Sequence, residues 1–108
     1  MADQTEVELV YSDLDKTLII DIKGELVFSN QELLLSKCKE FLSPVENIII
    51  DLREVSFIDS SGLGCFLMVQ EIDKFQGIGI TLRVGDNTVV ADSLKLANFK
   101  DLFKIDSV

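Results

Sequence analysis

The residues best suited to chemistry form one short run, Asp59-Ser60-Ser61-Gly62-Leu63-Gly64. Apolar residues at helical spacing follow it and predict a helix that begins here and ends near Phe75. The first backbone N–H groups of a helix are unpaired and carry partial positive charge, so either Asp59 or Ser60 is expected to cap them. The same field would favour a phosphoryl group on Ser61. A simple helix cap and a phosphorylation site both remain open.

Two glycines in this run, Gly62 and Gly64, are poor helix formers, so their presence calls for a reason. Close approach of another molecule to the start of the helix is one such reason. Residues 62–69 also contain no polar side chain, and a helix apolar on every face is either fully buried or exposes a patch. The pattern therefore permits a partner-binding surface beside Ser61, floored by Gly62, Leu63 and Phe66, or a helix enclosed by its neighbours.

The composition excludes several classes of function. The chain has no histidine, so a Ser-His-Asp or Cys-His catalytic unit and a His-ligated zinc site cannot form. It also lacks a G-x-S-x-G elbow and a P-loop, and we expect neither an enzyme nor a bound cofactor or metal. With 19 acidic and 10 basic residues the net charge is -9, which disfavours nucleic acid and anionic membranes as partners.

The length of 108 residues and a hydrophobic content of 47% fit a single domain over residues 1–108. No apolar run approaches the roughly 20 residues of a membrane span, and the acidic start, residues 1–6, is unlike a secretory signal. We therefore expect a cytoplasmic protein without membrane insertion. Cys38 and Cys65 lack CxxC spacing and lie in apolar helical stripes, which favours two buried, reduced thiols over a disulfide or metal pair.

The remaining pattern alternates strands and helices. Strands are predicted over 6–11, 17–23, 47–52 and 78–84, with a short final strand over 104–106, and 53–58 is interpreted as a connection. Helices are predicted over 29–43, 59–75 and 86–97. Ser29 and Glu32 fit a capping box for the first helix, Asp86 is expected to cap the third, and Asn98 suits a left-handed C-terminal cap.

This order predicts an α/β fold with a mixed sheet of four to five strands. The helices, each apolar on one face, should pack mainly on one side of the sheet, with the first two on the same side. The β-branched run Ile48-Ile49-Ile50 is typical of a central strand buried on both faces. A phospho-aspartate receiver domain with Asp51 as acceptor is disfavoured, because Asp13 and Asp15 have the wrong spacing for its magnesium site.

Four segments resemble the STAS-domain anti-sigma-factor antagonists. Asp59 to Gly64 resembles the D-S-S/T-G-L/I-G signature of that family, and residues 48–58 are similar to its preceding strand and connection. Residues 24–26 resemble the G-E-L/F step after its second strand. Residues 94–103 resemble its L-x-x-x-G-L-x-x-L-F ending, with Asn98 where glycine is usual. The resemblance covers nearly the whole chain, with the segments in the same order.

The resemblance implies a STAS fold and a phosphorylation switch. The unphosphorylated chain would bind a serine kinase that is also an anti-sigma factor, phosphorylation of Ser61 would weaken the complex, and a PP2C-type phosphatase would restore it. A monomer or weak homodimer is expected. The partner-binding or motif residues would be Asp59, Ser60, Gly62, Leu63, Gly64 and Phe66.

One position departs from the family pattern. Many members carry Asp directly after the G-x-L step, whereas this chain has Val27, followed by Phe28. This departure favours an alternative in which the chain is a non-switching STAS interaction subunit of a stress-signalling scaffold or transport complex.

Overall fold

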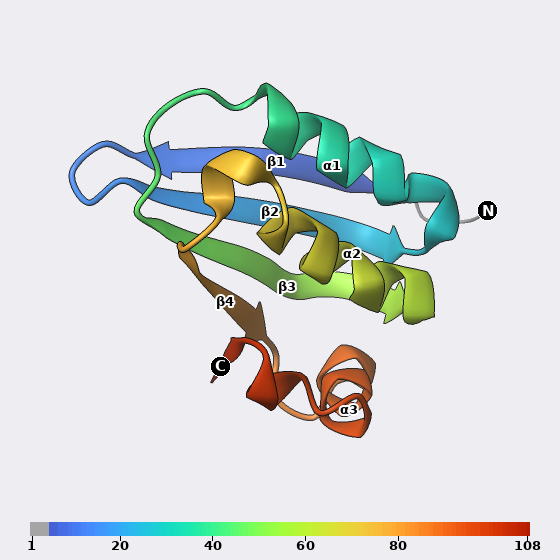
Figure 1. Ribbon diagram of the computed structural model, residues 1–108. Helices are drawn as coiled ribbons and strands as arrows, with labels where there is room; N and C mark the ends of the chain where they lie inside the picture. Colours follow the sequence, from blue (N-terminus) through green and yellow to red (C-terminus); the bar gives the residue numbers. More distant parts are fainter. Residues whose placement is uncertain (1–4) are drawn as a thin grey trace.

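The computed structural model describes residues 5–108, so most of the acidic start discussed above, residues 1–4, lies outside the described residues. A five-stranded sheet runs through the molecule in the order β1-β2-β3-β4-β5 (Figure 1). β1 is antiparallel to β2 and every other neighbouring pair is parallel, which confirms the predicted mixed sheet. The strands are β1 (Glu6–Ser12), β2 (Thr17–Leu26), β3 (Asn47–Ile58), β4 (Gly79–Val84) and β5 (Lys104–Ser107).

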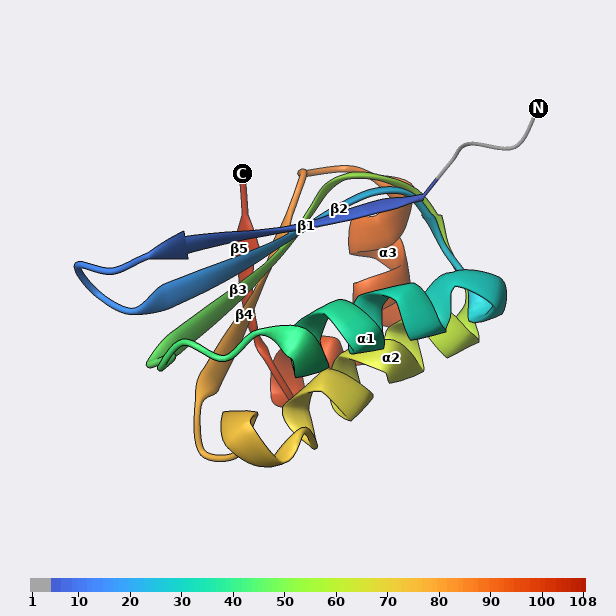
Figure 2. The same ribbon diagram turned by 90° about the horizontal axis from the view of Figure 1, so that it is seen from above.

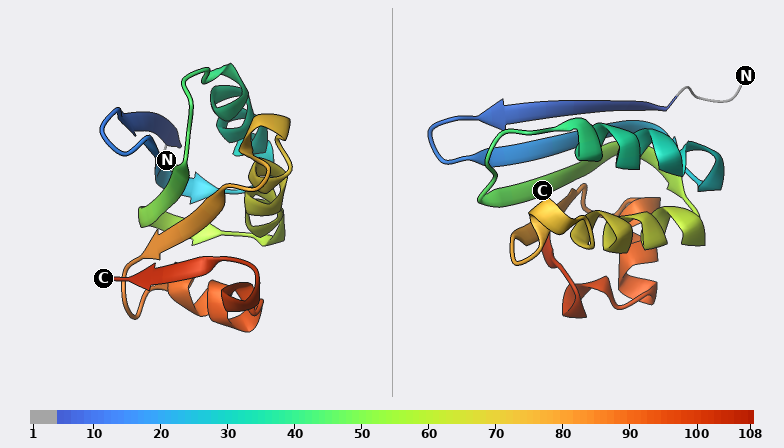
Figure 3. Two further views of the ribbon diagram at one scale, coloured as in Figure 1. Left: turned by 60° about the vertical axis from the view of Figure 1, so that its left-hand side comes forward. Right: turned by 45° about the horizontal axis from the view of Figure 1, so that its top comes forward.

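The helices all cover one face of this sheet. They are α1 (Gln31–Glu40), α2 (Ser60–Gln70) and α3 (Val89–Leu96), with 3-10 turns at Phe28–Asn30, Asp73–Phe75 and Phe99–Asp101. Strand order follows chain order, so successive right-handed crossovers place their helices on the same face. Figures 2 and 3 show α1 and α2 side by side on that face, as predicted. Within residues 5–108, no helix combines the length and the apolar character that crossing a membrane requires.

The hydrophobic core lies between the sheet and the helices. Alternate side chains of β2, β3 and β4 point into it and are buried, among them Ile20, Ile50 and Leu82. Ile49 points the other way and is only half-buried, because the helices leave its face of the sheet uncovered. The prediction that the Ile48–Ile50 strand is buried on both faces is therefore wrong.

The central strands are longer than the sequence predicted. Residues 53–58, interpreted as a connection, continue β3 because they keep pairing with β2 as far as Leu26↔Ile58. Two register shifts interrupt this pairing and break the alternation of apolar residues that would mark a strand. Conversely, α2 ends at Gln70, short of the predicted Phe75, and Asp73–Phe75 form a separate 3-10 turn.

Two predicted helix caps are not the ones used. α1 begins at Gln31 after Asn30, so the Ser29–Glu32 capping box does not form. α3 is capped by Thr88, whose hydroxyl accepts the N–H of Ala91 at 3.1 Å, instead of by Asp86. Asn98 does adopt the predicted left-handed conformation, with φ 55° and ψ 38°.

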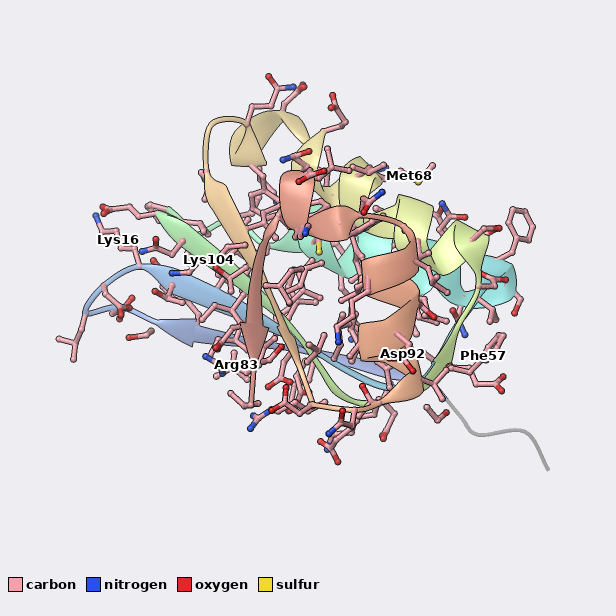
Figure 4. The ribbon with its side chains drawn as sticks, turned by 90° about the horizontal axis from the view of Figure 1, so that it is seen from below. Lys16, Phe57, Met68, Arg83, Asp92 and Lys104 are labelled. Carbon is pink, nitrogen blue, oxygen red and sulfur yellow. The ribbon has the colours of Figure 1, made fainter. Side chains whose placement is uncertain are left out.

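A row of charged side chains crosses the uncovered face of the sheet. Directly paired positions place it in the order Glu8, Asp21, Asp51, Arg83 and Asp106. Asp51 is only 6% exposed and accepts two side-chain hydrogen bonds from Arg53, at 3.1 and 2.8 Å. Burial opposes ionisation of Asp51, but the hydrogen bonds and charge of Arg53, with the charge of Arg83, hold its pKa below the ordinary value. Arg83 and Lys104 of this face are labelled in Figure 4.

Replacing Asp51 should therefore destabilise the fold in a pH-dependent way. Asp51→Asn keeps the shape but removes the charge, and should cost roughly 1–3 kcal/mol of unfolding free energy at pH 7. A depressed carboxylate pKa stabilises above the unfolded value of about 3.9, and this contribution is lost as pH falls through the folded pKa. Urea denaturation at several pH values should show the two proteins converging in acid. A constant difference down to the lowest pH would contradict the ion-pair assignment.

The two cysteines are free thiols buried where α1 meets α2. Cys38 and Cys65 are both 0% exposed. Burial raises the pKa of Cys38 to about 11, against a small opposing effect of Lys74, and burial with the neighbouring Cys38 raises that of Cys65 to about 12. Both groups are therefore neutral thiols near pH 7.

Because the thiolate is the reactive form, neither cysteine should react quickly with a thiol reagent in the folded protein. With a small aromatic disulfide reagent at pH 7.5, we expect labelling only as fast as unfolding, and full labelling in denaturant. Rapid stoichiometric labelling of either thiol under native conditions would contradict the buried arrangement.

Candidate functional site

The motif predicted from the sequence lies at the carboxyl edge of the sheet. β2 and β3 run parallel and end together, with Leu26 paired to Ile58. The residues that follow, the turn Val27–Asn30 and the start of α2 from Asp59 to Gly64, are therefore neighbours at this edge (Figure 1). In open α/β sheets the carboxyl edge is where binding residues commonly gather.

The carboxylate of Asp59 joins these two segments. Its Oδ1 atom accepts the N–H of Gly62 at 2.8 Å and so caps α2. Its Oδ2 atom accepts the N–H of Phe28 at 3.4 Å, across the gap to the β2–α1 turn. The cap that the sequence left open between Asp59 and Ser60 is thus Asp59.

The turn itself is held by Asn30. Its side-chain oxygen accepts the N–H of Val27 at 2.8 Å, and its amide donates to the carbonyl of Glu25 at 2.8 Å. The backbone N–H of Asn30 also donates to the carbonyl of Val27 at 3.1 Å. Phe28 therefore stands on a fixed backbone while its side chain remains 74% exposed.

The two serines occupy the first turn of α2. Ser60 is exposed and Ser61 is half-buried. Exposure gives no reason to prefer the Ser61 hydroxyl as the phosphoacceptor, since Asp59 is the cap and Ser60 is the more exposed of the two serines. The choice of Ser61 rests on the family resemblance of the motif.

The two glycines of the motif have different surroundings. A Cβ atom on Gly62 would lie 2.2 Å from the carbonyl oxygen of Leu26 and 2.7 Å from a side-chain carbon of Ile58. Gly62 is thus required by packing inside the chain, where α2 begins against the end of β2. A Cβ on Gly64 would meet nothing within 4 Å among residues 5–108. Only Gly64 fits the prediction of a glycine left open to another molecule.

The apolar run of α2 is divided between core and surface. Phe66 is 0% exposed and packs edge-on against Phe99, with ring centroids 6.3 Å apart. Its predicted place on the floor of a partner surface is therefore wrong, because this side chain points into the core against the 3-10 turn Phe99–Asp101. Leu63 is partly buried against the core, whereas Leu67 and Met68 are exposed. The helix is therefore neither enclosed by its neighbours along its whole length nor exposed as a single apolar patch.

Sequence reasoning missed one feature of this edge. Phe28 and Phe57 are both exposed aromatic residues beside the motif, and they received no role. Phe57 lies where β3 passes into α2, and Met68 lies further along the same helix (Figure 4). The sequence feature that could have revealed this role is Phe28, a large apolar residue directly after Val27, the position at which many family members carry an acid.

The sheet order, the helices on one face and the capped serine motif define a small α/β domain of the kind predicted. Residues 8–108 match the family model described as the STAS domain. The chain therefore belongs to the STAS domain family, which confirms the predicted family and its fold.

Several solved structures have a similar fold. An anti-sigma factor antagonist from Mycobacterium paratuberculosis has a TM-score of 0.81 at 15% identity, over 98% of this chain and 90% of its own. The antagonist SpoIIAA in its unphosphorylated form has a TM-score of 0.72 at 21% identity, over 95% and 88%. Bacillus SpoIIAA in its phosphorylated form has a TM-score of 0.63 at 20% identity, over 95% and 91%. These likenesses establish the shared fold.

The surroundings of the two glycines predict opposite effects of the same substitution. Gly62→Ala should destabilise the fold by about 1–3 kcal/mol or more, because its Cβ must displace the Leu26 backbone. Gly64→Ala should stabilise it by roughly 0.5–1 kcal/mol, since alanine is the better helix former and its Cβ meets open space. Urea denaturation of the matched pair checks this. Equal losses of stability would show that both positions are enclosed.

Proposed function

We propose that this chain is an anti-sigma-factor antagonist, which binds an anti-sigma-factor serine kinase when unphosphorylated and is switched off by phosphorylation of Ser61. The observation that carries the proposal is the placement of the D-S-S-G-L-G motif of a STAS domain at the capped, accessible start of α2. Solved proteins of this fold named as anti-sigma factor antagonists, one of them in a phosphorylated form, support it.

The electrostatics of the helix start suit such a switch. A phosphoryl group adds roughly -1.5 to -2 charges, and in the free chain the unpaired N–H groups at the start of α2 would stabilise them. In a complex the same charges would have to leave water beside the carboxylate of Asp59. A loss of even about 3 kcal/mol lowers affinity more than a hundredfold, so binding fails while the fold persists. Removal of the phosphate by a PP2C-type phosphatase would restore binding.

The protein in this proposal is a binding module of the cytoplasm and performs no catalysis of its own. The kinase supplies the phosphoryl transfer and the sigma factor the transcriptional output. Without a bound antagonist the kinase would hold the sigma factor inactive.

A second candidate is a non-switching STAS subunit of a stress-signalling scaffold or transport complex. The observation that favours it is Val27, where many antagonists carry the acid that belongs to the kinase contact. In that case Ser61 would remain unmodified, and only the interaction surface would be used.

Incubation with a purified serine kinase of the anti-sigma type from the source organism and ATP should phosphorylate Ser61. Mass spectrometry should place the phosphate on Ser61 in the wild type and in Ser60→Ala, and find none in Ser61→Ala. Ser61→Ala should still bind the kinase. Ser61→Asp should keep its melting temperature and lose binding by at least about a hundredfold.

Phosphate on Ser60 would refute the assignment of the acceptor. Kinase binding without phosphorylation of either serine would favour the non-switching candidate. Unfolding of Ser61→Asp would show that the charge acts on the fold instead of the interface.

A further inference from the structure

We infer that Phe28 is the main contact of this interface, inserting its ring into an apolar pocket of the kinase beside the phosphoacceptor. The inference rests on the proposed function and specifies the partner surface. Phe28 lies outside the Asp59–Gly64 motif. It directly follows Val27, which occupies the position where many antagonists carry an acid.

The first support is a fixed backbone under an exposed ring. Phe28 is 74% exposed, yet the turn below it is held through Asn30 and through the 3.4 Å hydrogen bond from its own N–H to Asp59. Burying an aromatic ring on such a backbone gains a large apolar area at little cost in conformational entropy. Aromatic residues, Phe among them, are enriched in protein–protein interfaces relative to the rest of the surface.

The second support is the distribution of charge. The chain carries 19 acidic and 10 basic residues, yet Leu26–Gln31 and the whole of α2, Ser60–Gln70, contain none. These two segments meet at the carboxyl edge, with Asp59 as the charged residue between them. Asp59 is engaged in hydrogen bonds to Gly62 and Phe28. Depletion of charge is the compositional mark of the centre of a protein interface.

The third support is the continuity of this surface with Ser61. One carboxylate fixes both the turn that presents Phe28 and the helix start that presents the serine. Gly64, one helical turn beyond, offers space for close approach because its missing side chain meets nothing of this chain within 4 Å among residues 5–108. A partner that covers Ser61 and the start of α2 is therefore expected to reach the turn that carries Phe28.

This arrangement specifies the chemistry of the kinase. A kinase that binds Val27 and Phe28 must offer them an apolar pocket. A kinase whose antagonist carries an acid at the position of Val27 would instead offer a basic group. The arrangement also explains the switch, because phosphorylation of Ser61 adds charge to two segments in which Asp59, between them, is the charged residue. Phosphorylation leaves the contact of Phe28 with the kinase unchanged. The affinity from this contact is too small to offset the cost of burying the phosphate.

The test uses the purified serine kinase that phosphorylates Ser61, without ATP so that the complex is not turned over. Isothermal titration should show Phe28→Ala binding at least about 30-fold more weakly than the wild type, with Phe28→Leu between the two. Leu14→Ala is the matched control: Leu14 is fully exposed in the β1–β2 turn, at the opposite end of the sheet. It should bind like the wild type.

Kinetics separate a docking role from a structural one. With ATP present, Phe28→Ala should raise the KM of the kinase for this substrate by a similar factor and leave kcat nearly unchanged. The melting temperature of Phe28→Ala should stay near that of the wild type, since the ring is exposed.

Binding of Phe28→Ala within threefold of the wild type would overturn the inference while Ser61 phosphorylation still supports the proposed function. An equal loss in Leu14→Ala would also overturn it, because exposed apolar residues in general would then be responsible. Failure of the wild-type chain both to bind and to be phosphorylated would overturn the proposed function and this inference with it.

Discussion

The two hydrogen bonds of the Asp59 carboxylate determine how the edge of this domain is built. One oxygen caps α2 through the N–H of Gly62, and the other reaches the N–H of Phe28 in the preceding crossover. These bonds form because β2 and β3 are parallel and end in register, which brings the two segments together. Gly62 then allows α2 to begin against the carbonyl of Leu26, where any side chain would clash.

The fold separates charge from the candidate interface. Ion pairs such as Arg53 with Asp51 and Arg83 with Asp106 lie on the uncovered face of the sheet, away from the helices. The turn segment Leu26–Gln31 and the helix α2, Ser60–Gln70, contain no charged residue, and Asp59 directly precedes α2. In the proposed interface, a phosphate on Ser61 would therefore add charge to segments that carry none of their own apart from the adjoining Asp59.

Much of this architecture follows from local pattern. Alternation of polar and apolar residues predicted β1, a β-branched apolar run predicted β2, and helical spacing of apolar residues predicted the three helices. The end of β3 was missed because its register shifts break that alternation. The one-sided burial of Ile49 was missed because a β-branched run reads the same whether one or both faces are covered.

The site was only partly predictable. The serines and glycines of the motif were recognised from their types and spacing, but the sequence does not show which groups approach them. Gly62 differs from Gly64 because the Leu26 carbonyl and the Ile58 side chain lie against it. Asp59 is the cap in place of Ser60 because its carboxylate accepts the N–H groups of Gly62 and Phe28. The burial of Phe66 likewise depends on Phe99, which lies far along the chain.

In the proposed switch, phosphorylation of Ser61 alters the surface at the start of α2 and leaves the fold intact. Amide NMR spectra of the chain with and without phosphate on Ser61 test it most directly. We expect shifted resonances only at the start of α2 and in the Val27–Asn30 turn, which Asp59 connects to that helix. Shifts extending through β1, β4 or the far end of α1 would show a change of fold and contradict the account.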